Sequence, residues 1–402
     1  MDHPESNKRS HILYLPRWYP HRYDPMPGLF IERHGIAASE HFLVTVLYVH
    51  QDDALTKKKF EVVESTDEPL PTIRIYYKKS NTGIGFIDKI VNACRFYRFH
   101  QKGIRMITRQ HGNPDLIHVH VLTRHGIIAL LRKIFKKTPF VVTEHWTRYL
   151  PSTNTYNGWF RKKITSWVGK HAAAIMPVTA NLRDAMIDCG INNNNYVIIP
   201  NVVNMEMFHP SEKKKTKTKK RIVHVSCFDD QQKNITGILR VLKRTIQERD
   251  DFVCDMVGDG IDYDKILMYS KELGLPEDTV IFYGLKENHE LAEIMANGDF
   301  MIMFSNYENL PVVILESYAC GVPVVSTDVG GIKEHLDKNL GLLIHARDEE
   351  ALYNSIQYML DNISNYDADS LRQYPTDHFS NRVIGNQLWK VYKASINQSF
   401  VS

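Results

Sequence analysis

The strongest constraint on the fold of this chain is the recurrence of short apolar runs between helical stretches, in two successive series. The first series contains HILYLPRW, FLVTVLYV, IRIYY, DLIHVH, FVVTEH, AAIMPVT and YVIIPN. The second contains RIVHVSC, FVCDMVG, VIFYG, FMIMFS, VPVVST and GLLIH. Strands that alternate with helices form open parallel sheets with helical crossovers. The sequence therefore predicts an α/β protein with two Rossmann-like, doubly wound domains.

A break after Pro210 separates the two series. The segment SEKKKTKTKKR is strongly basic and lacks apolar residues, and because no aromatic residue interleaves with the lysines, a solvated loop is favoured over a nucleic-acid patch. We expect a first domain over 1–205 and a second over 206–380. A final segment, 381–402, is expected to form a helix that Ser380 caps and that packs back on the first domain through Trp389 and Tyr392.

Composition agrees with two globular units. The 402 residues exceed one ordinary core, and 43% apolar with 24% charged residues is typical of soluble proteins. Up to Met205 there are 28 Lys and Arg against 16 Asp and Glu, and afterwards 22 against 30, so the halves carry +12 and −8 and imply different partners. Five scattered cysteines and a polar N-terminus fit a cytoplasmic protein, with peripheral contact at the inner membrane face left open.

The segment 305–328, SNYENLPVVILESYACGVPVVSTD, has the clearest local signals. It follows the apolar strand FMIMFS and predicts a loop, a helix, a turn and a strand. Pro311 suits the first helical position and Gly321 the C-terminal cap. A helix that begins at the carboxyl edge of a parallel strand offers its first amides to a diphosphate. The amides expected there belong to Asn309, Leu310, Val312 and Val313.

Two carboxylates flank this helix start. Glu308 precedes the helix and Glu316 lies in its second turn, so both can face one cleft at different depths. Carboxylates beside a diphosphate are suited to accepting hydrogen bonds from hydroxyls, one set on a ribose and one on a sugar. Taken alone, this spacing is also typical of a capping acid and a surface-facing helix residue.

The whole segment resembles the E-x7-E signature of glycosyltransferase family 4 (glycosyl transferases group 1), a family with the GT-B fold. The proline after the loop, the Gly-Val-Pro turn and the pair Gly330-Gly331 agree as well. The resemblance implies that Glu308 contacts the transferred sugar and Glu316 the ribose. It also implies that the first domain binds the acceptor, the second binds a nucleotide sugar, and the C-terminal helix crosses back to the first domain.

Further segments resemble the same family over almost the whole chain. Gly28, in Pro27-Gly28-Leu29-Phe30, falls in the family's N-terminal glycine loop, where a side chain would obstruct donor and acceptor. His145, in VVTEHW, stands where the family has a histidine near the donor sugar's outer hydroxyls, although a lone histidine is also commonly structural. Asn201, in IIPNVVNMEMF, falls at the crossover between domains, as a hinge or turn residue.

In the second half, VSCFDDQQKN resembles the first strand-to-helix turn of the family's donor domain. Lys233 falls at its phosphate-binding lysine, and a lysine there can neutralise a leaving diphosphate without a metal. Phe228 replaces the family's usual arginine, which leaves more of the charge stabilisation to Lys233 and weakens the expectation of activity. Gly258, in VGDG, and Leu285, after Tyr283-Gly284, resemble donor-site turns, and Leu285 is expected beside the nucleobase.

We expect no catalytic metal and no cofactor besides the UDP- or GDP-linked sugar. No D-x-D is flanked by a strand, and His118 and His120 of IHVH are expected on opposite faces of a strand, so no ligand set is evident. No carboxylate base accompanies an acceptor either, which is compatible with a retaining mechanism in which the departing phosphate takes the acceptor's proton. Glu308, Lys233 and His145 are the candidate catalytic residues.

One helix, from about Asp88 to Gln110, is expected to carry a basic stripe. Its cations recur at steps of three and four within an arc of about 80°; they are Arg95, Arg98, Lys102, Arg105 and Arg109. The core face beside the stripe is expected to be Cys94, Tyr97, Ile104 and Ile107. Trp159 and Phe160 stand next to three cations, as in interfacial anchors. Both faces are either solvated or rest on anionic lipid headgroups.

The leading hypothesis is a metal-independent, retaining hexosyltransferase. It would move a hexose or N-acetylhexosamine from a UDP- or GDP-sugar to a glycan or lipid-linked acceptor in surface polysaccharide biosynthesis, with an anionic membrane surface as an open further partner and no nucleic acid. Two alternatives stay open. A GT-B-like nucleotide-sugar epimerase would turn over donor without acceptor, and a non-catalytic sugar-nucleotide-binding subunit is favoured by Phe228.

Overall fold

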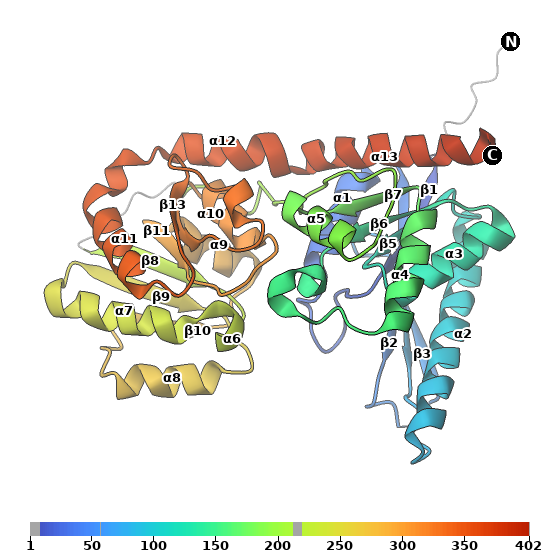
Figure 1. Cartoon of the computed structure of the whole chain (residues 1–402), viewed down its shortest axis with the longest axis horizontal. Helices are drawn as coiled ribbons and strands as arrows, with labels where there is room; N and C mark the ends of the chain where they lie inside the picture. The colour runs from blue at the N-terminus through green and yellow to red at the C-terminus, as the bar shows by residue number, and fades with distance from the viewer. Residues whose placement is uncertain (1–8, 57, 212–218, 402) are drawn as a thin grey trace, which may run out of the picture.

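The computed structural model describes residues 9–56, 58–211 and 219–401, without the side chains of 399–401. The polar N-terminal segment and most of the lysine-rich segment after Pro210 lie outside the described residues, and so does the solvated loop expected there. Figure 1 shows two α/β units side by side, with a long helical run along one side of both. The α/β class with two doubly wound sheets is therefore confirmed.

The first sheet has seven strands in the order β3-β4-β2-β1-β5-β6-β7. All its pairs are parallel except β3 with β4. The strands are β1 His11–Pro16, β2 Leu43–Gln51, β3 Phe60–Ser65, β4 Thr72–Tyr77, β5 Leu116–His120, β6 Phe140–Glu144 and β7 Ala174–Pro177. The edge strand β3 had no counterpart among the predicted strands, whereas the apolar run at 196–201 forms only an isolated bridge from Tyr196 to Ile175.

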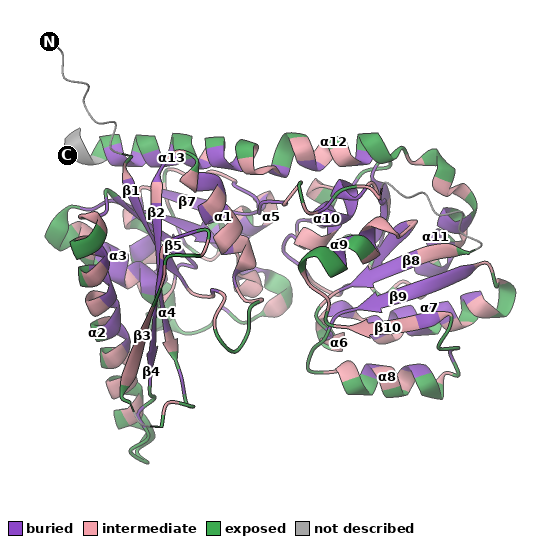
Figure 2. Ribbon diagram, turned by 180° about the vertical axis from the view of Figure 1, so that it is seen from behind, coloured by how far each residue is buried: buried purple, intermediate pink, exposed green. Residues whose placement is uncertain are grey.

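Helices cover both faces of this sheet. They are α1 Leu29–Ser39, α2 Gly85–His111, α3 Arg124–Lys136, α4 Trp159–His171 and α5 Ala180–Asp188. Successive strand residues face opposite sides: Leu13 and Leu15 pack with α2 to α5, while Ile12 and Tyr14 pack with α1 and the C-terminal helix. Figure 2 shows the resulting buried strands and inward helix faces.

The second sheet is entirely parallel, in the order β10-β9-β8-β11-β12-β13. Its strands are β8 Lys220–Val225, β9 Phe252–Val257, β10 Val280–Gly284, β11 Phe300–Met303, β12 Val324–Thr327 and β13 Gly341–Ile344. The helices are α6 Asp230–Lys233, α7 Ile235–Glu248, α8 Tyr263–Glu272, α9 Asn288–Ala296, α10 Val312–Ala319, α11 Glu349–Asn362 and α12 Ala368–Phe379. One core lies under α9, α10 and α12 and the other under α7, α8 and α11.

The last helix, α13 Asn381–Val401, follows α12 and packs against α1 of the first unit (Figure 1). At Gly385 an added Cβ would lie 2.5 Å from the carbonyl oxygen of Ala37, so glycine permits this close approach. Tyr392 is fully buried, as expected, whereas Trp389 remains 41% exposed, with its ring centroid 6.4 Å from that of His41 in the first unit. Ser380 directly precedes α13 in extended conformation and its carbonyl accepts from the amide of Ile384, as at an N-cap, while its hydroxyl donates to the Thr376 carbonyl of α12.

Candidate functional site

The strand orders locate the candidate site. In each sheet the chain reverses its direction of travel once, between β1 and β5 in the first and between β8 and β11 in the second. Ligands of open α/β sheets bind beyond the carboxyl ends of strands at such switch points. Lys233, at the end of the short helix α6, and Glu308 follow β8 and β11, and the loops after β1 and β6 contain Gly28 and His145. The topology therefore gathers the sequence-predicted residues at facing sheet edges.

Lys233 and Glu308 form a buried ion pair. Lys233 ends the short helix α6, and its ammonium contacts the Glu308 carboxylate. Burial alone would lower the pKa of Lys233, but the adjacent carboxylate outweighs it and raises the pKa above its ordinary value. Glu308 also accepts a hydrogen bond of 2.9 Å from the Ser305 hydroxyl and one of 3.4 Å from the Gln232 amide. The lysine is therefore held charged at the end of the parallel strands.

The helix start beside this pair differs slightly from the sequence expectation. Pro311 is the N-cap of α10, in extended conformation with ψ of 114°, so the helix begins at Val312 rather than at the proline. The first amides of a helix have no partner within it. The amides of Val312 and Val313 therefore lie at the helix start, as expected. The preceding residues Asn309 and Leu310 are buried.

Glu316 faces the other unit of the chain. Its carboxylate accepts a hydrogen bond of 2.6 Å from the guanidinium of Arg33, on α1, and its side chain is 6% exposed. The spacing alone also allowed Glu308 to be a capping acid and Glu316 to face solvent, but the structure buries Glu316. Glu308 and Glu316 instead lie buried where the two units meet, and we call this contact region between the units the cleft.

The glycine pair after β12 packs against this loop. A Cβ on Gly330 would lie 2.0 Å from the carbonyl oxygen of Glu308, and one on Gly331 would lie 2.4 Å from the Thr179 methyl group of the first unit. The amide of Gly331 donates to the carbonyl of Asn309 at 2.8 Å. Both glycines are thus required for close packing around Glu308 and across the cleft.

Asn309 connects the two walls of the cleft. Its side-chain amide donates to the carbonyl oxygen of His145 at 3.0 Å and accepts from the Thr179 hydroxyl at the same distance. His145 follows β6 and its imidazole lies against Phe30, with ring centroids 4.5 Å apart. The histidine that the sequence singled out therefore lines the same cleft as the two glutamates.

Gly28 is the N-cap of α1 and has a φ of +81°. An added Cβ would lie 2.2 Å from the carbonyl oxygen of Trp18. The need for glycine at this position therefore arises from its own backbone, before any ligand is considered. Asn201 lies buried in the crossover from the first unit to the second, and no turn is assigned at its position.

The expectation for His118 and His120 was wrong. Residues two apart on a strand share a face, and their ring centroids lie 4.0 Å apart. His34, His120 and His145 moreover form a cluster in which one possible ligand atom of each lies within 4.8 Å of the others, so a set able to hold a metal ion does exist. Burial lowers the pKa of all three, which keeps the imidazoles neutral at neutral pH.

Each of these three rings has one buried nitrogen without a hydrogen-bond partner: His34 Nδ1, His120 Nε2 and His145 Nδ1. The second nitrogen of His34 bonds the carbonyl oxygen of Pro200 at 2.8 Å. A neutral imidazole can donate or accept, so the cluster suits sugar hydroxyls as well as a cation.

Sequence reasoning missed several residues of this site. Arg33 and His34 stand five and six positions after Gly28 on one helix, a spacing that could have indicated them. Glu144 directly precedes His145, and its buried carboxylate accepts the amides of His145 and Trp146 at 3.0 and 2.9 Å. It thereby holds the histidine loop against β6.

Phe228 lies in the core of the second unit and is fully buried, with its ring centroid 5.4 Å from that of Tyr263. It contributes no charge to the cleft. Gly258 has a φ of +142°, and a Cβ there would lie 1.9 Å from the carbonyl oxygen of Ser226. Leu285, just beyond β10, is 50% exposed and open to a ligand.

The basic stripe lies on α2, beside a groove of about 500 Å³. The groove is lined by Lys59, Phe60, Arg95, Arg98, Phe99, Lys102 and Arg105, and Arg109 follows on the same helix. The expected core face is correct for Ile104 and Ile107, but Cys94 is exposed because Phe96 and Phe99 point inward instead.

Exposed apolar side chains accompany these cations. Trp159 and Phe160 at the start of α4 are each 69% exposed. The beginning of α2 and the residue before it, which sequence reasoning did not single out, expose Ile84, Phe86, Ile87 and Ile90. The first unit therefore combines cations and apolar groups on one helix.

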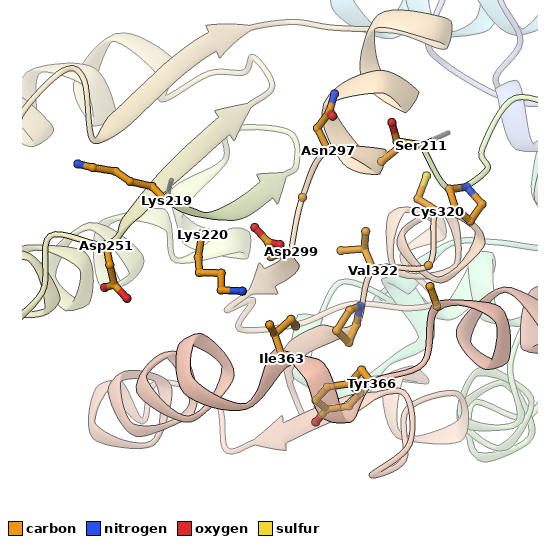
Figure 3. Close-up of a pocket in the computed structure, with 16 residues that line it drawn as sticks. Ser211, Lys219, Lys220, Asp251, Asn297, Asp299, Cys320, Val322, Ile363 and Tyr366 are labelled. Carbon is orange, nitrogen blue, oxygen red and sulfur yellow. The ribbon is translucent and has the colours of Figure 1, made fainter. Parts of the chain in front are cut away.

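A second cavity of about 500 Å³ lies away from the cleft (Figure 3). Lys220, Asp251, Asp299 and Val322 line it, at or just before the amino ends of β8, β9, β11 and β12. This is the sheet edge opposite Lys233 and Glu308. Since parallel sheets bind ligands at the carboxyl edge, we do not assign the function to this cavity.

Solved structures share this two-unit architecture. Sucrose-phosphate synthase from Thermosynechococcus elongatus superposes with a TM-score of 0.76 at 18% identity, covering 98% of this chain and all of that one. Anabaena HepE in complex with UDP gives 0.71 at 16% identity, covering 96% and 100%. The fold is that of the GT-B class of glycosyltransferases.

The sequence itself matches two family profiles, Glycosyltransferase Family 4 over residues 46–207 and Glycosyl transferases group 1 over residues 206–374. The chain belongs to glycosyltransferase family 4, as the E-x7-E segment suggested. It is a glycosyltransferase by family, and among its described residues no helix is long and apolar enough to cross a membrane.

Curated relatives match part of the chain. The chain is 29% identical to N-acetyl-alpha-D-glucosaminyl L-malate synthase of Bacillus anthracis over 236 residues, which are 56% of this chain and 59% of that protein. It is 27% identical to a diphospho-undecaprenol 4-alpha-N-acetylgalactosaminyltransferase of Campylobacter jejuni over 60% of this chain and 66% of that one. The matches thus span about three fifths to two thirds of these relatives.

The buried histidines predict acid sensitivity. Burial lowers the pKa of His34 and of His100 to about 4, whereas an unfolded histidine titrates near 6.5. Between these values the unfolded chain binds more protons, so the free energy of unfolding should fall as pH drops below about 6.5. The slope is about 1.4 kcal/mol per pH unit for each such histidine.

Urea unfolding at about pH 7 and pH 5 measures this effect. The variant His100→Leu removes one titrating group away from the cleft and should lower the pH slope. Equal stability of the wild type at both pH values would contradict the prediction.

Proposed function

We propose that this glycosyltransferase is retaining and metal-independent, and that it transfers a hexose or N-acetylhexosamine from a UDP- or GDP-sugar. The observation that carries the proposal is the cradle at the second switch point, where the charged Lys233 and the first amides of α10 lie beside two buried carboxylates. Amides and an ammonium suit a diphosphate, and carboxylates suit hydroxyls.

In the proposed reaction the bond from the sugar's anomeric carbon to the diphosphate breaks, and the acceptor hydroxyl bonds to that carbon on the same face. Lys233 and the α10 amides stabilise the charge that develops on the leaving diphosphate. Glu308 orients the sugar hydroxyls, Glu316 holds the ribose, and the neutral His145 bonds an outer hydroxyl. The departing phosphate takes the acceptor's proton.

The relatives support the choice of substrates. HepE was crystallised with UDP, and the Campylobacter relative by name transfers N-acetylgalactosamine to a diphospho-undecaprenol-linked sugar. We therefore propose a glycan or lipid-linked acceptor, bound by the first unit, in surface polysaccharide synthesis.

Removal of the central charges should abolish transfer. We expect Glu308→Gln and Lys233→Ala each to lower the transfer rate at least a hundredfold, measured with radiolabelled sugar from the donor that UDP or GDP stabilises in a thermal-shift screen. Each single change leaves a buried charge unpaired, which costs roughly 3–5 kcal/mol of stability. The double variant Lys233→Met/Glu308→Gln removes both charges and should fold yet remain inactive.

Glu349→Gln, on the exposed face of α11, is the matched control and should leave transfer unchanged. Wild-type rates in Glu308→Gln and Lys233→Ala would overturn the site assignment. Donor turnover without any acceptor would favour an epimerase instead.

Metal independence can be tested separately. Because Lys233 and helix amides supply the positive charge, transfer should persist in EDTA and should not rise on addition of Mg²⁺ or Mn²⁺. The assay compares initial rates before and after dialysis against EDTA. Loss of activity in EDTA with recovery in one of these metals would contradict the proposal and direct attention to the cluster of His34, His120 and His145.

We further propose that the first unit rests on anionic lipid. The α2 groove presents cations, and apolar side chains at its beginning can enter the headgroup region. Co-sedimentation should show stronger binding to vesicles with phosphatidylglycerol than to phosphatidylcholine alone. Arg98→Glu/Arg105→Glu should reduce it at least threefold, whereas Arg240→Glu, on α7, should not. Equal partitioning of the wild type to both vesicles would refute the idea.

A further inference from the structure

The candidate donor cradle contains two ion pairs of different origin. Lys233 and Glu308 both belong to the second unit, whereas Glu316 pairs with Arg33 from the first. The carboxylate side chains are each 6% exposed, and the cations are 9% and 20% exposed. The four charges sum to zero, so these side chains alone offer no excess positive charge to a diphosphate.

Arg33 enters this cluster from a fixed support. It lies in the second turn of α1, a helix that packs against α13, and its guanidinium carbon lies 6.0 Å from the ring centroid of Phe208 on the crossover. Among the described residues, Glu316 is its single hydrogen-bond partner, through one nitrogen at 2.6 Å. Most of the five N–H donors of this guanidinium are therefore available to another acceptor.

A donor that occupies the cleft must rearrange this pair. If ribose hydroxyls donate to both oxygens of Glu316, as in the proposed function, one of them takes the oxygen that Arg33 now contacts. A partly buried guanidinium without a partner is costly. The incoming diphosphate supplies the missing anion, and guanidinium groups bind phosphate oxygens in bidentate fashion. Phe228, buried in the core, offers no competing cation.

We propose that Arg33 is a donor-binding residue that exchanges Glu316 for the diphosphate when a nucleotide sugar binds. This rests on the proposed function, in which Glu316 accepts the ribose hydroxyls. The first unit would then contribute a cation directly to the leaving group, so donor binding would couple the two units.

The exchange has a consequence that a purely structural ion pair lacks. A nucleoside offers hydroxyls to Glu316 but nothing to Arg33, whereas a nucleoside diphosphate offers both. Removal of the guanidinium should therefore leave nucleoside binding unchanged or stronger and make nucleoside diphosphate binding weaker. The two ligands should respond in different directions to one substitution.

The experiment compares full-length wild type with Arg33→Met by calorimetric titration with UDP and uridine, or with GDP and guanosine if GDP gives the larger thermal shift. We expect the diphosphate to bind Arg33→Met at least tenfold more weakly, with no loss for the nucleoside. Arg240→Met, which removes an exposed arginine that pairs with Glu349, is the matched control and should change neither.

Since Arg33→Met leaves Glu316 buried and unpaired, the comparison is repeated in a Glu316→Gln background, where the double variant carries neither charge of the pair. Arg33→Met should still weaken UDP binding there, because its contact with phosphate does not depend on Glu316. Equal or tighter UDP binding by Arg33→Met, or an effect that vanishes in Glu316→Gln, would overturn the inference while leaving the proposed function intact. Failure of the wild type to bind either UDP or GDP would defeat both.

Discussion

The ion pair between Lys233 and Glu308 is the interaction on which the rest of the candidate site depends. Both side chains are buried, so neither can remain charged without the other, and loss of one partner costs roughly 3–5 kcal/mol. Ser305 and Gln232 add hydrogen bonds to the same carboxylate. The fold therefore keeps a buried cation, Lys233, beyond the ends of two central strands and near the N-terminus of α10. A cation and a helix N-terminus together are suited to binding an anion.

Much of the fold could be predicted because its signals are local. Apolar runs of strand length, alternating with helical stretches, are sufficient for two parallel sheets, and the segment around Pro311 and Gly321 carries its own start and stop signals. The antiparallel strand β3 was missed because none of its residues is fully buried, so its sequence FEVVES lacks the apolar pattern of a central strand. The apolar run that begins at Tyr196 was predicted as a strand, but in the structure it forms a single bridge, from Tyr196 to Ile175.

The candidate site was predictable only where one motif holds its residues together. Glu308 and Glu316 belong to one loop-and-helix segment and are eight positions apart, so the sequence could place them near each other. Arg33 meets Glu316 across 283 positions of chain, and that encounter depends on how the two units pack, which no local pattern encodes. The prediction for His118 and His120 was wrong for a simpler reason. Residues two apart on a strand share a face, so the two side chains should have been expected on the same side of the sheet.

A row of adjacent histidines, which we call the histidine wall, connects the cleft to the C-terminal helix; it consists of His118, His120 and His145. The Tyr392 hydroxyl on α13 lies 2.6 Å from His118 Nδ1 and 2.7 Å from the Tyr14 hydroxyl. The His118 ring lies 4.0 Å from that of His120, whose Nδ1 lies 3.3 Å from His145 Nε2. Since α13 continues from α12 of the second unit, one helix both tethers that unit and supports the wall that its carboxylates face. The geometry of the cleft therefore depends on α13 as much as on the loops that line it.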